Sequence, residues 1–375
     1  MPFYNDLRPD SDHKKKGYAA LFPGMTEKEK IRCLRGLLEL RNGLEMEIAP
    51  KIADKNLIIA SWNIREFGHL KKRLPETYFY IAEILNRFDL IAVQEVKSSL
   101  DDLDIVMRLL GSDWKFMVND ITEGNDGNSE RSAYIYNTKR VKLAGIAGEI
   151  ALHDKLTQNS TIKQFKRAPY ITGFVAGWKK FSLINVHLHP NDGRDDLAFR
   201  KEEVRLLLAA IQEKIDRGRF WNENLILVGD FNFYSGARKD DVSIQMLYDA
   251  GFKEIEALKE KDTNASLSEA YDRLFFKVNQ YFRIGLDEEG RERGGVFNPF
   301  LYLFREHFHQ DYRAQMLADY GGSKDLGDPE LLRKYFLRYW RRGQLSDHFP
   351  IWSEIIIDSS DDFLANKLMQ MNRLP

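Results

Sequence analysis

Five separate parts of this 375-residue chain each place a polar, reactive side chain directly after a short apolar run or a turn. One such residue at a strand end is commonplace, and it usually only contacts solvent. Five sets are hard to explain by solubility alone, because the strands of a layered sheet can bring their ends to one common edge. The residues are Asn63, Glu95, His187, the pair Asp230 and Asn232, and the pair Asp347 and His348.

The chemistry that this set favours is hydrolysis of a phosphoester with the help of a hard divalent cation. Carboxylate and amide oxygens suit Mg²⁺ or Mn²⁺, and the single cysteine, Cys33, excludes a zinc site built from several thiolates. Mg²⁺ typically binds one or two carboxylates and leaves its other positions to water and substrate phosphate. We therefore expect Mg²⁺ as the cofactor, with Mn²⁺ as the alternative.

The segments that must position these residues have the pattern of short buried strands alternating with helices. Periodicity predicts helices at 78–88, 100–110 and 196–216, which suggests two sheets flanked by helices. The predicted strands are 57–61, 90–93, 133–136, 171–176, 181–186, 225–228, 273–276 and 351–357.

Two terminal segments lie outside this core pattern. Residues 1–56 are predicted to form an N-terminal helical extension, because Thr26 and Glu29 have the spacing of a capping box and an apolar stripe of helical period follows them. We expect this helix to pack on the main domain, with a contact to a partner or a second copy as the alternative. The main domain is predicted at 57–358, and a C-terminal tail at 359–375.

The segment at about 278–343 interrupts the main domain between two predicted strands. It is rich in aromatic residues and arginine, and a segment of this length carries either a function or structure of its own. We predict a mostly helical insertion whose aromatic residues form a local core. Its arginines keep contact with nucleic acid open as a further role.

Composition excludes several classes of protein. The chain has 56 Lys and Arg against 57 Asp and Glu, a net charge of −1, so it is not a general polycation, and 43% hydrophobic content fits a globular protein. Cys33 is alone, so no intramolecular disulfide can form and a reducing compartment is expected. The N-terminus lacks the apolar run of a secretory signal, and no run approaches the ~20 apolar residues of a spanning helix. These features predict a soluble, cytoplasmic protein with no stable membrane association.

Six short motifs, in this order, resemble the signature of the endonuclease/exonuclease/phosphatase superfamily, the deoxyribonuclease I-like fold. Each motif alone is weak, but six in the family's order are specific. The resemblance implies a four-layer α/β (α+β) sandwich of two packed, mainly antiparallel sheets flanked by helices, and it implies metal-dependent phosphoesterase chemistry. The motifs are Ser-Trp-Asn-Ile (61–64), Val-Gln-Glu-Val (93–96), Ile-Asn-Val-His-Leu (184–188), Val-Gly-Asp-Phe-Asn (228–232), Tyr-Asp-Arg-Leu (271–274) and Leu-Ser-Asp-His-Phe-Pro (345–350).

Two further stretches are similar to the deoxyribonuclease I branch of the superfamily. Residues 130–136 resemble that branch's acid ahead of an apolar strand, here Glu130. Residues 165–170 resemble its segment that carries a phosphate-contacting arginine, here Arg167. His189 lies outside the family motif, and we expect it to be incidental.

The expected metal ligands are Glu95, Asn63 and Asp347. Glu95 follows a buried strand and is the natural carboxylate ligand, with Asn63 and Asp347 as neighbours or water-mediated ligands; the resemblance implies the same, and Asn63 is also a candidate for phosphate binding. Asp230 and Asn232 lie two apart on one turn, so both can face the scissile phosphate. The resemblance implies that this pair orients the attacking water, binds phosphate or holds a second metal.

Two histidines are the expected proton-transfer groups. His348 is the candidate general base or transition-state stabiliser, because an imidazole titrates near neutral pH and a carboxylate on its other nitrogen fixes the tautomer. The resemblance implies that Asp272 is the partner of one of the two histidines. His187 would pair with Glu130 in the same way and would protonate the leaving oxygen or bind the phosphate. Asp230 stays open as the base in place of His348.

The leading hypothesis is a Mg²⁺-dependent DNA endonuclease that uses water as the nucleophile and forms no covalent intermediate. Basic clusters near the expected site would bind phosphates without reading sequence. The alternative is a phosphatase or phosphodiesterase for a phosphoinositide, a phospholipid or another small phosphoester. A third reading is a binding protein on a retired catalytic fold, or an enzyme whose insertion covers the active edge. A protein partner or a second copy would bind through the N-terminal helix or the insertion.

Overall fold

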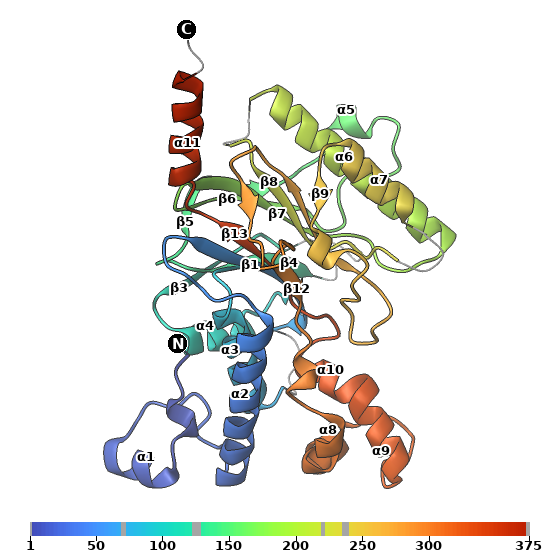
Figure 1. The fold of residues 1–375 in the computed structure, drawn as a ribbon. Coiled ribbons are helices and arrows are strands. Elements are labelled where there is room, and N and C mark those ends of the chain that lie inside the picture. The colour runs from blue at the N-terminus through green and yellow to red at the C-terminus, as the bar shows by residue number, and fades with distance from the viewer. Residues whose placement is uncertain (1, 69–72, 122–128, 219–221, 235–239, 373–375) are drawn as a thin grey trace.

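Two mixed β-sheets pack face to face, and helices cover the outer face of each sheet (Figure 1). The layer order confirms the predicted four-layer sandwich. Met1 of the expected N-terminal extension and 373–375 of the expected tail lie outside the described residues. The computed structural model describes residues 2–68, 73–121, 129–218, 222–234 and 240–372.

The first sheet has seven strands. They are β1 (Asn56–Phe67), β2 (Leu90–Lys97), β3 (Trp114–Val118), β4 (Glu130–Asn137), β11 (Arg283–Ile284), β12 (Gly294–Val296) and β13 (Ile351–Ile356). The strand order is β11-β13-β1-β2-β4-β3, and β12 also pairs with β13. Only β1 and β2 run parallel among these pairs, so the sheet is mainly antiparallel, as predicted.

The second sheet has six strands. They are β5 (Lys142–Glu149), β6 (Tyr170–Ala176), β7 (Lys179–His187), β8 (Leu225–Asp230), β9 (Lys253–Glu254) and β10 (Asp272–Lys277). Their order is β5-β6-β7-β8-β10-β9, and β7 and β8 form the parallel pair. Each sheet therefore contains one parallel pair, and the carboxyl ends of these two pairs supply most of the candidate site.

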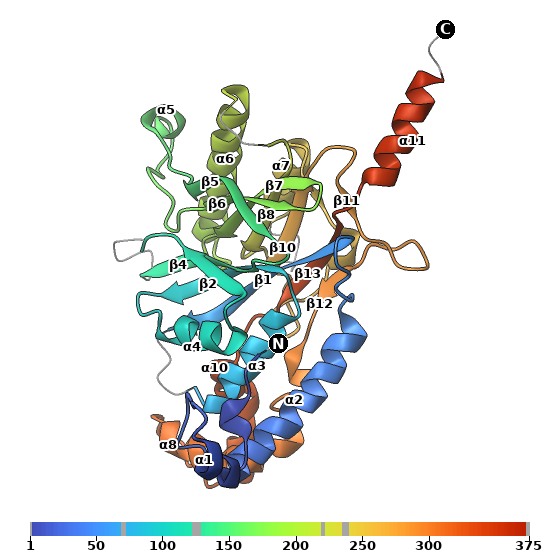
Figure 2. The same ribbon diagram turned by 90° about the vertical axis from the view of Figure 1, so that its left-hand side faces the viewer.

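The helices fall into three groups (Figures 1 and 2). The N-terminal part of the chain and the first sheet carry α1 (Asp10–Lys16), α2 (Glu27–Glu47), α3 (Pro75–Asn86) and α4 (Asp101–Leu110). The second sheet carries α5 (Asp154–Thr157), α6 (Arg194–Asp216) and α7 (Asp241–Asp249). The last part of the chain forms α8 (Arg313–Asp319), α9 (Pro329–Tyr335), α10 (Arg341–Gln344) and α11 (Ser360–Met371). None of the described helices is both long and apolar enough to cross a bilayer.

Both faces of each central strand are buried, which explains why the sequence shows these strands as continuous apolar runs. In β1, Leu57 and Ile59 point into the core between the sheets, while Ile58 and Ala60 point into the outer core under the helices. Successive side chains of a strand alternate between its faces, so a strand covered on both faces needs apolar residues at every position. All eight predicted strands are present in the structure.

The edge strands and parts of the insertion differ from the sequence-based expectation. β3 and β5 lie at sheet edges, and exposed and half-buried residues alternate along β5, so no apolar run marks it. The insertion is helical in its second half, but its first half adds the short strands β11 and β12 beside β13. The expected tail also contains a helix, α11, which projects from the body (Figures 1 and 2).

The N-terminal helix α2 shares the core of the first sheet. Thr26 and Glu29 form the capping box that their spacing predicts, with each side chain accepting a hydrogen bond from the other residue's backbone N–H. Cys33, Leu37 and Leu40 then occupy one face of the helix and join the apolar cluster that also contains α3 residues. We propose that residues 1–56 fold together with the main domain rather than as a separate unit.

Leu40→Ala tests this arrangement. The Leu40 side chain is fully buried, so its truncation should lower the free energy of unfolding by about 2–5 kcal/mol through lost apolar contact and a residual cavity. Leu38→Ala on the same helix is the control, because Leu38 is 67% exposed, and its effect should stay within about 0.5 kcal/mol. Urea denaturation of the full chain measures both, and equal stability of Leu40→Ala and wild type would contradict the shared core.

Candidate active site

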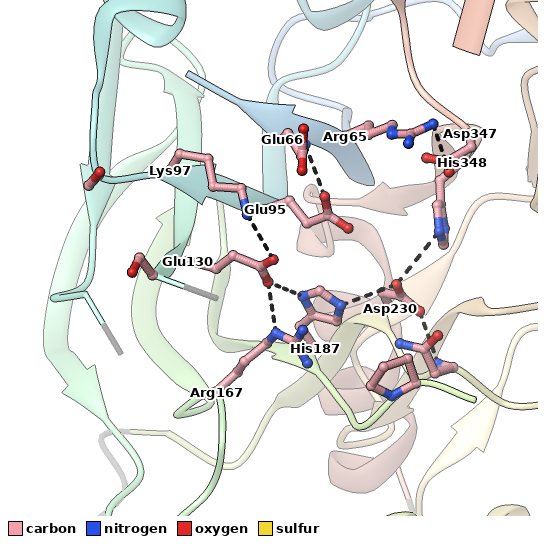
Figure 3. Close-up of a pocket in the computed structure, with 14 residues that line it drawn as sticks. Arg65, Glu66, Glu95, Lys97, Glu130, Arg167, His187, Asp230, Asp347 and His348 are labelled. Carbon is pink, nitrogen blue, oxygen red and sulfur yellow. Dashed lines mark hydrogen bonds and ion pairs between the residues drawn. The ribbon is translucent and has the colours of Figure 1, made fainter. Parts of the chain in front are cut away.

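A cleft of about 730 Å³ lies where the strand ends of the two sheets meet (Figure 3). The parallel pairs β1·β2 and β7·β8 bring their carboxyl ends to it. The antiparallel neighbours β4 and β10 begin at the same edge. Glu130 at the start of β4 pairs with Lys97 of β2, and Asp272 at the start of β10 pairs with Asp230 of β8. The lining residues are Arg65, Glu66, Glu95, Lys97, Ser98, Ser129, Glu130, Arg167, His187, Pro190, Asp230, Asn232, Asp347 and His348.

The structure brings all ten sequence-predicted site residues together at this edge. Eight of them line the cleft directly. The other two, Asn63 and Asp272, are buried and contact lining residues from behind. Among the described residues that line the cleft, none belongs to 278–343, so the expectation that the insertion covers the active edge is not supported.

Glu95 and Asn63 form the oxygen-rich side of the cleft. Glu95 lies where the β1·β2 register is interrupted, and its positive φ of 59° is the kind of local distortion that re-aims a side chain at a bulge. The backbone N–H of Glu66 donates to Glu95 Oε2 at 2.9 Å, and Asn63 Nδ2 donates to Glu95 Oε1 at 3.1 Å. These two bonds fix the carboxylate with its remaining acceptor capacity free for a ligand.

Asn63 and Glu95 fit a hard cation. Asn63 Nδ2 bonds both Glu95 and Asp230, which turns the amide oxygen away from these carboxylates. That oxygen, Oδ1, is buried and has no hydrogen-bond partner among the described residues, which is rare for a buried acceptor. Asp347 lines the same cleft and is partly exposed, with Arg65 Nη1 at 3.6 Å from its Oδ2. The amide and carboxylate oxygens are the ligand types that Mg²⁺ prefers.

A second group of atoms, on Asp230, Asp272 and His348, is also close enough to hold a cation. Here His348 Nδ1 and Asp272 Oδ2 lie 2.8 Å apart and satisfy each other, and Thr263 Oγ1 donates to the same carboxylate oxygen. The other carboxylate oxygen, Asp272 Oδ1, is buried and has no hydrogen-bond partner among the described residues. This group is therefore a second candidate cation site beside the one formed by Glu95 and Asn63.

The carboxylates around His348 favour the protonated form of its imidazole. Burial alone would lower the pKa of the imidazole, but the carboxylates of Asp272 and Asp230 outweigh it and raise the pKa of His348 well above its usual value. Asp272 also fixes the ring orientation through Nδ1, which leaves Nε2 facing Asp230 Oδ2 at 3.8 Å. The predicted pairing of Asp272 with a histidine is thus present, and the histidine is His348.

His187 occupies the matching position on the other side of Asp230. Its Nε2 lies 3.5 Å from Asp230 Oδ2, and its Nδ1 lies 3.3 Å from Glu130 Oε2. Burial would raise the pKa of Glu130, but the hydrogen bond and charge of His187, together with Arg167 and Lys97, outweigh burial and hold that pKa below its usual range. Glu130 is therefore a carboxylate that orients the His187 ring.

Asp230 is the centre of the arrangement, because both histidines face its Oδ2 (Figure 3). Asn63 Nδ2 donates to the same oxygen at 3.0 Å. Burial alone would raise the pKa of Asp230, but the charges of His348 and His187 outweigh burial and lower it. Asn232 has a positive φ of 51°, and its backbone N–H donates to Asp230 Oδ1 at 2.9 Å. The turn after β8 thus holds a deprotonated carboxylate between two histidines.

Arg167 lies at the cleft wall, but part of its guanidinium is already used. Its Nε donates to Glu130 Oε2 at 2.7 Å, so it acts on Glu130 as well as on any phosphate in the cleft.

Two basic residues that sequence reasoning missed, Arg65 and Lys97, also line the cleft. Arg65 lies two residues after Asn63, and Lys97 lies two residues after Glu95. This spacing from a predicted metal ligand could have identified both residues from the sequence.

Ser346 is a further residue that sequence reasoning passed over, although it lies inside a quoted motif. Its hydroxyl donates to the Asn63 carbonyl at 2.6 Å and accepts from the backbone N–H groups of Arg65 and His348. This one side chain joins β1 to the turn that carries Asp347 and His348. The catalytic turn is therefore fixed relative to the oxygen-rich side of the cleft.

Comparison with known proteins gives a consistent set of relatives. The chain is 27% identical to deoxyribonuclease-1 of Equus caballus over 190 residues, which cover 47% of this chain and 61% of that protein. It is 25% identical to deoxyribonuclease gamma of Mus musculus over 329 residues, which cover 83% of this chain and 87% of that protein. The chain thus spans less than two thirds of the horse protein and most of the mouse protein. No family model matches the chain.

Among solved structures, the human Nocturnin catalytic domain with bound sulfate is similar to this chain. The TM-score is 0.49 at 13% sequence identity, and the alignment covers 82% of this chain and 96% of that domain.

Side chains of helix α6 fix the position of the loop that follows His187. His189 is not among the residues that line the cleft; its Nε2 pairs with Asp196 and its backbone N–H donates to Glu203 Oε2 at 2.8 Å. The buried Arg200 donates to the carbonyl oxygens of His189 and Asn191. These contacts place Pro190 in the cleft wall, while His189 packs against helix α6 outside the lining of the cleft.

Glu203 makes the stability of this loop depend on pH. Burial raises the pKa of Glu203 from 4.5 to about 7, although the His189 N–H and nearby cations oppose the shift. Because the folded state binds this proton more tightly than the unfolded chain, Glu203 contributes stability below pH 4.5 that is lost as the pH rises through 7.

Glu203→Gln should remove this pH dependence, since a glutamine oxygen still accepts from the His189 N–H. Between pH 5 and pH 8 the wild type should lose roughly 2–3 kcal/mol of unfolding free energy that the variant keeps. Glu202→Gln is the control on the same helix. Glu202 pairs with Arg205 near the surface, so this variant should show the same dependence of unfolding free energy on pH as the wild type. Denaturant titrations at each pH measure this, and parallel profiles for Glu203→Gln and wild type would contradict it.

Proposed function

Because the chain belongs to the endonuclease/exonuclease/phosphatase superfamily of hydrolytic phosphoesterases, with the deoxyribonuclease I-like fold, we propose that it is a Mg²⁺-dependent nuclease that hydrolyses phosphodiester bonds of DNA. The observation that carries the proposal is the position of Asp230 between His187 and His348, opposite the oxygen donors Glu95 and Asn63. The similarity to proteins named deoxyribonuclease supports DNA as the substrate class.

The metal would be held by Glu95 and Asn63, with Asp347 as a neighbouring or water-mediated ligand. When bound, Mg²⁺ supplies Lewis-acid stabilisation of negative charge on a phosphate oxygen. The Asn63 oxygen that lacks a protein partner and the fixed Glu95 carboxylate are the groups that support this assignment.

Proton transfer is assigned to the three groups around Asp230. The deprotonated Asp230 carboxylate orients the attacking water and accepts its proton. His348, which Asp272 keeps protonated, stabilises negative charge on the phosphate or donates to the leaving oxygen through Nε2. His187, oriented by Glu130, is placed on the other side of the same carboxylate and binds the phosphate there.

The distribution of cations fits an extended polyanion. Arg65, Lys97 and Arg167 line the cleft, and Arg342 of the insertion lies behind the Asp347 turn. Arg342 Nη2 donates to the Ala265 carbonyl at 3.2 Å, and the Ala265 N–H donates to the Asp347 carbonyl at 2.7 Å. The insertion therefore places a cation next to the active edge without covering it.

Cleavage of supercoiled plasmid tests the proposed activity. The wild type should nick plasmid with Mg²⁺ or Mn²⁺ but not with EDTA, and His348→Ala should lower the rate by about 10²–10⁴-fold, as loss of a proton-transfer group typically does. His153→Ala is the matched control, because His153 is an exposed histidine paired with Glu213, outside the cleft lining. Agarose gels quantify the nicked product.

Two results would overturn the proposal. Plasmid left intact by a folded wild type, together with hydrolysis of a phosphoinositide or another small phosphoester, would transfer the same chemistry to the alternative substrate class. Equal nicking rates for His348→Ala and wild type would remove the assigned active site.

Arg342→Ala tests whether the insertion contributes to DNA binding. Burial, followed by the charges of Arg65 and Arg338, lowers the pKa of Arg342 despite the attraction of Asp347. Its Nε is buried and has no hydrogen-bond partner among the described residues, so a phosphate would supply an acceptor for this guanidinium. Its loss should flatten the plot of log binding constant against log salt by about 0.9, the slope of one phosphate contact. Fluorescence anisotropy with a DNA duplex at several salt concentrations measures the slope.

Arg341→Ala is the control for this experiment, because Arg341 lies over the Phe300 ring at 4.5 Å and should leave the slope unchanged. Hydrolysis of bis(p-nitrophenyl) phosphate should proceed equally in Arg342→Ala and wild type, since this small diester is too short to reach Arg342. An unchanged salt slope in Arg342→Ala would contradict the role of the insertion.

A further inference from the structure

A second cavity, of about 480 Å³, lies between helix α2 and the first part of the insertion. It shares no lining residue with the catalytic cleft. Its two walls are the N-terminal extension and residues 302–312, which are the two parts of the chain added to the predicted core pattern; both views show α2 beside the insertion helices (Figures 1 and 2). The lining residues are Lys28, Ile31, Arg32, Arg35, Gly36, Glu39, Tyr80, Tyr302, Leu303, Phe304, Arg305, Phe308, Asp311 and Tyr312.

Helix α2 presents two separate faces. One face is apolar and packs into the core under the first sheet, as described above. The other face, formed by residues spaced three or four apart from Lys28 to Glu39, lines the cavity. At its middle is Gly36, where an added Cβ would meet the Tyr80 hydroxyl, so the missing side chain lets the Tyr80 ring pack against the helix at the cavity floor.

Aromatic rings make up most of the rest of the lining. Tyr80 and Phe304 meet edge to face with centroids 5.8 Å apart, and Phe304 packs on Tyr312 at 5.2 Å. These three rings are buried, while Phe308 and Ile31 are 40% and 47% exposed. A cavity with aromatic walls and a half-exposed apolar mouth is suited to a flat apolar group, which these rings would cover.

The cavity also carries cations that the protein does not neutralise. Arg32 is committed to the buried Glu76, with Nε at 2.8 Å and Nη2 at 2.7 Å from Oε2. By contrast, Lys28, Arg35 and Arg305 form no ion pair with any residue in the described part of the chain.

Arg305 is the most informative of these three cations. Its Nε is buried and makes no hydrogen bond to any of the described residues, and its guanidinium lies 5.2 Å from the centroid of the Phe308 ring. A buried, unsatisfied donor costs free energy unless a ligand or water accepts from it. Arg32 is paired with Glu76, so the lining holds three further cations against the two acids Glu39 and Asp311. This balance favours an acceptor that is an anion.

We propose that this cavity is a binding site for an organic anion with a flat aromatic body. The body lies against Phe308, Tyr302 and Ile31, and the anionic group accepts hydrogen bonds from Arg305 and Arg35. The apolar side chains bury the flat body, and the guanidinium groups donate charge-assisted hydrogen bonds to the anionic group, so both parts of the ligand contribute to affinity. This site is separate from the proposed nuclease centre and does not depend on it.

Two fluorescent probes with nearly the same aromatic body test the proposal on the full chain. 8-Anilinonaphthalene-1-sulfonate has the anionic group, and N-phenyl-1-naphthylamine lacks it. The sulfonate should bind the wild type at one molecule per chain and at least tenfold more tightly than the neutral amine. Arg305→Ala and Arg35→Ala should each weaken sulfonate binding by about tenfold, the typical effect of one hydrogen bond to a charged group. Both should leave the affinity for the neutral amine within about twofold.

Ile31→Trp should block the cavity mouth and weaken both probes. Arg41→Ala is the control on the same helix, because Arg41 faces Glu83 and lies outside the cavity lining, and it should change neither affinity. If Arg305→Ala does not fold, the exposed positions Arg35 and Lys28 carry the test. Sulfonate binding that is unchanged in Arg35→Ala or in Ile31→Trp would overturn the proposal, as would equal affinity of the wild type for the two probes.

Discussion

A buried amide pair ties the two sheets together directly beneath the cleft. Gln94 of β2 donates from Nε2 to Asn185 Oδ1 of β7 at 2.6 Å, and Asn185 donates back to the carbonyl oxygens of Val93 and Ala133. Glu95 directly follows Gln94 in β2, and His187 lies two residues after Asn185 at the end of β7. Because buried polar groups must be satisfied, only one offset between the sheets is allowed, and that offset puts the metal side opposite the histidine side.

The charges of the site depend on this closeness. Asp230 is buried and would be neutral if it were alone, yet two histidines and an amide keep it ionised, while Asp272 keeps His348 protonated. Each group therefore has its protonation state set by a residue from another strand or from the other sheet. A shift of one sheet by one residue relative to the other would separate these partners. The buried charges would then be unpaired and would destabilise the folded state.

The sequence was informative where burial on both faces or a recognisable motif constrained it. The central strands were predictable because both of their faces need apolar residues. Seven of the ten site residues were predicted from their places after strands or turns, whereas Glu130, Arg167 and Asp272 were predicted only from the resemblance to the family. Edge strands such as β5 have one weakly covered face and so no apolar run. Ser346, Arg65 and Arg200 escaped for a different reason. Ser346 and Arg200 donate hydrogen bonds to distant backbone carbonyls, and Arg65 forms an ion pair with Asp347, so only the folded chain brings these atoms together.

The additions to the core fold are structurally joined to the catalytic edge. The insertion starts beside β13, lines the second cavity with residues 302–312, and returns through α10 to the turn of Ser346, Asp347 and His348. Gln344 of α10 accepts from the Leu74 N–H at the start of α3, and α3 in turn carries Glu76, the partner of Arg32 in the cavity. The cavity lining and the catalytic turn are therefore linked through packed, hydrogen-bonded elements, so their positions are set together by the same two helices, α3 and α10.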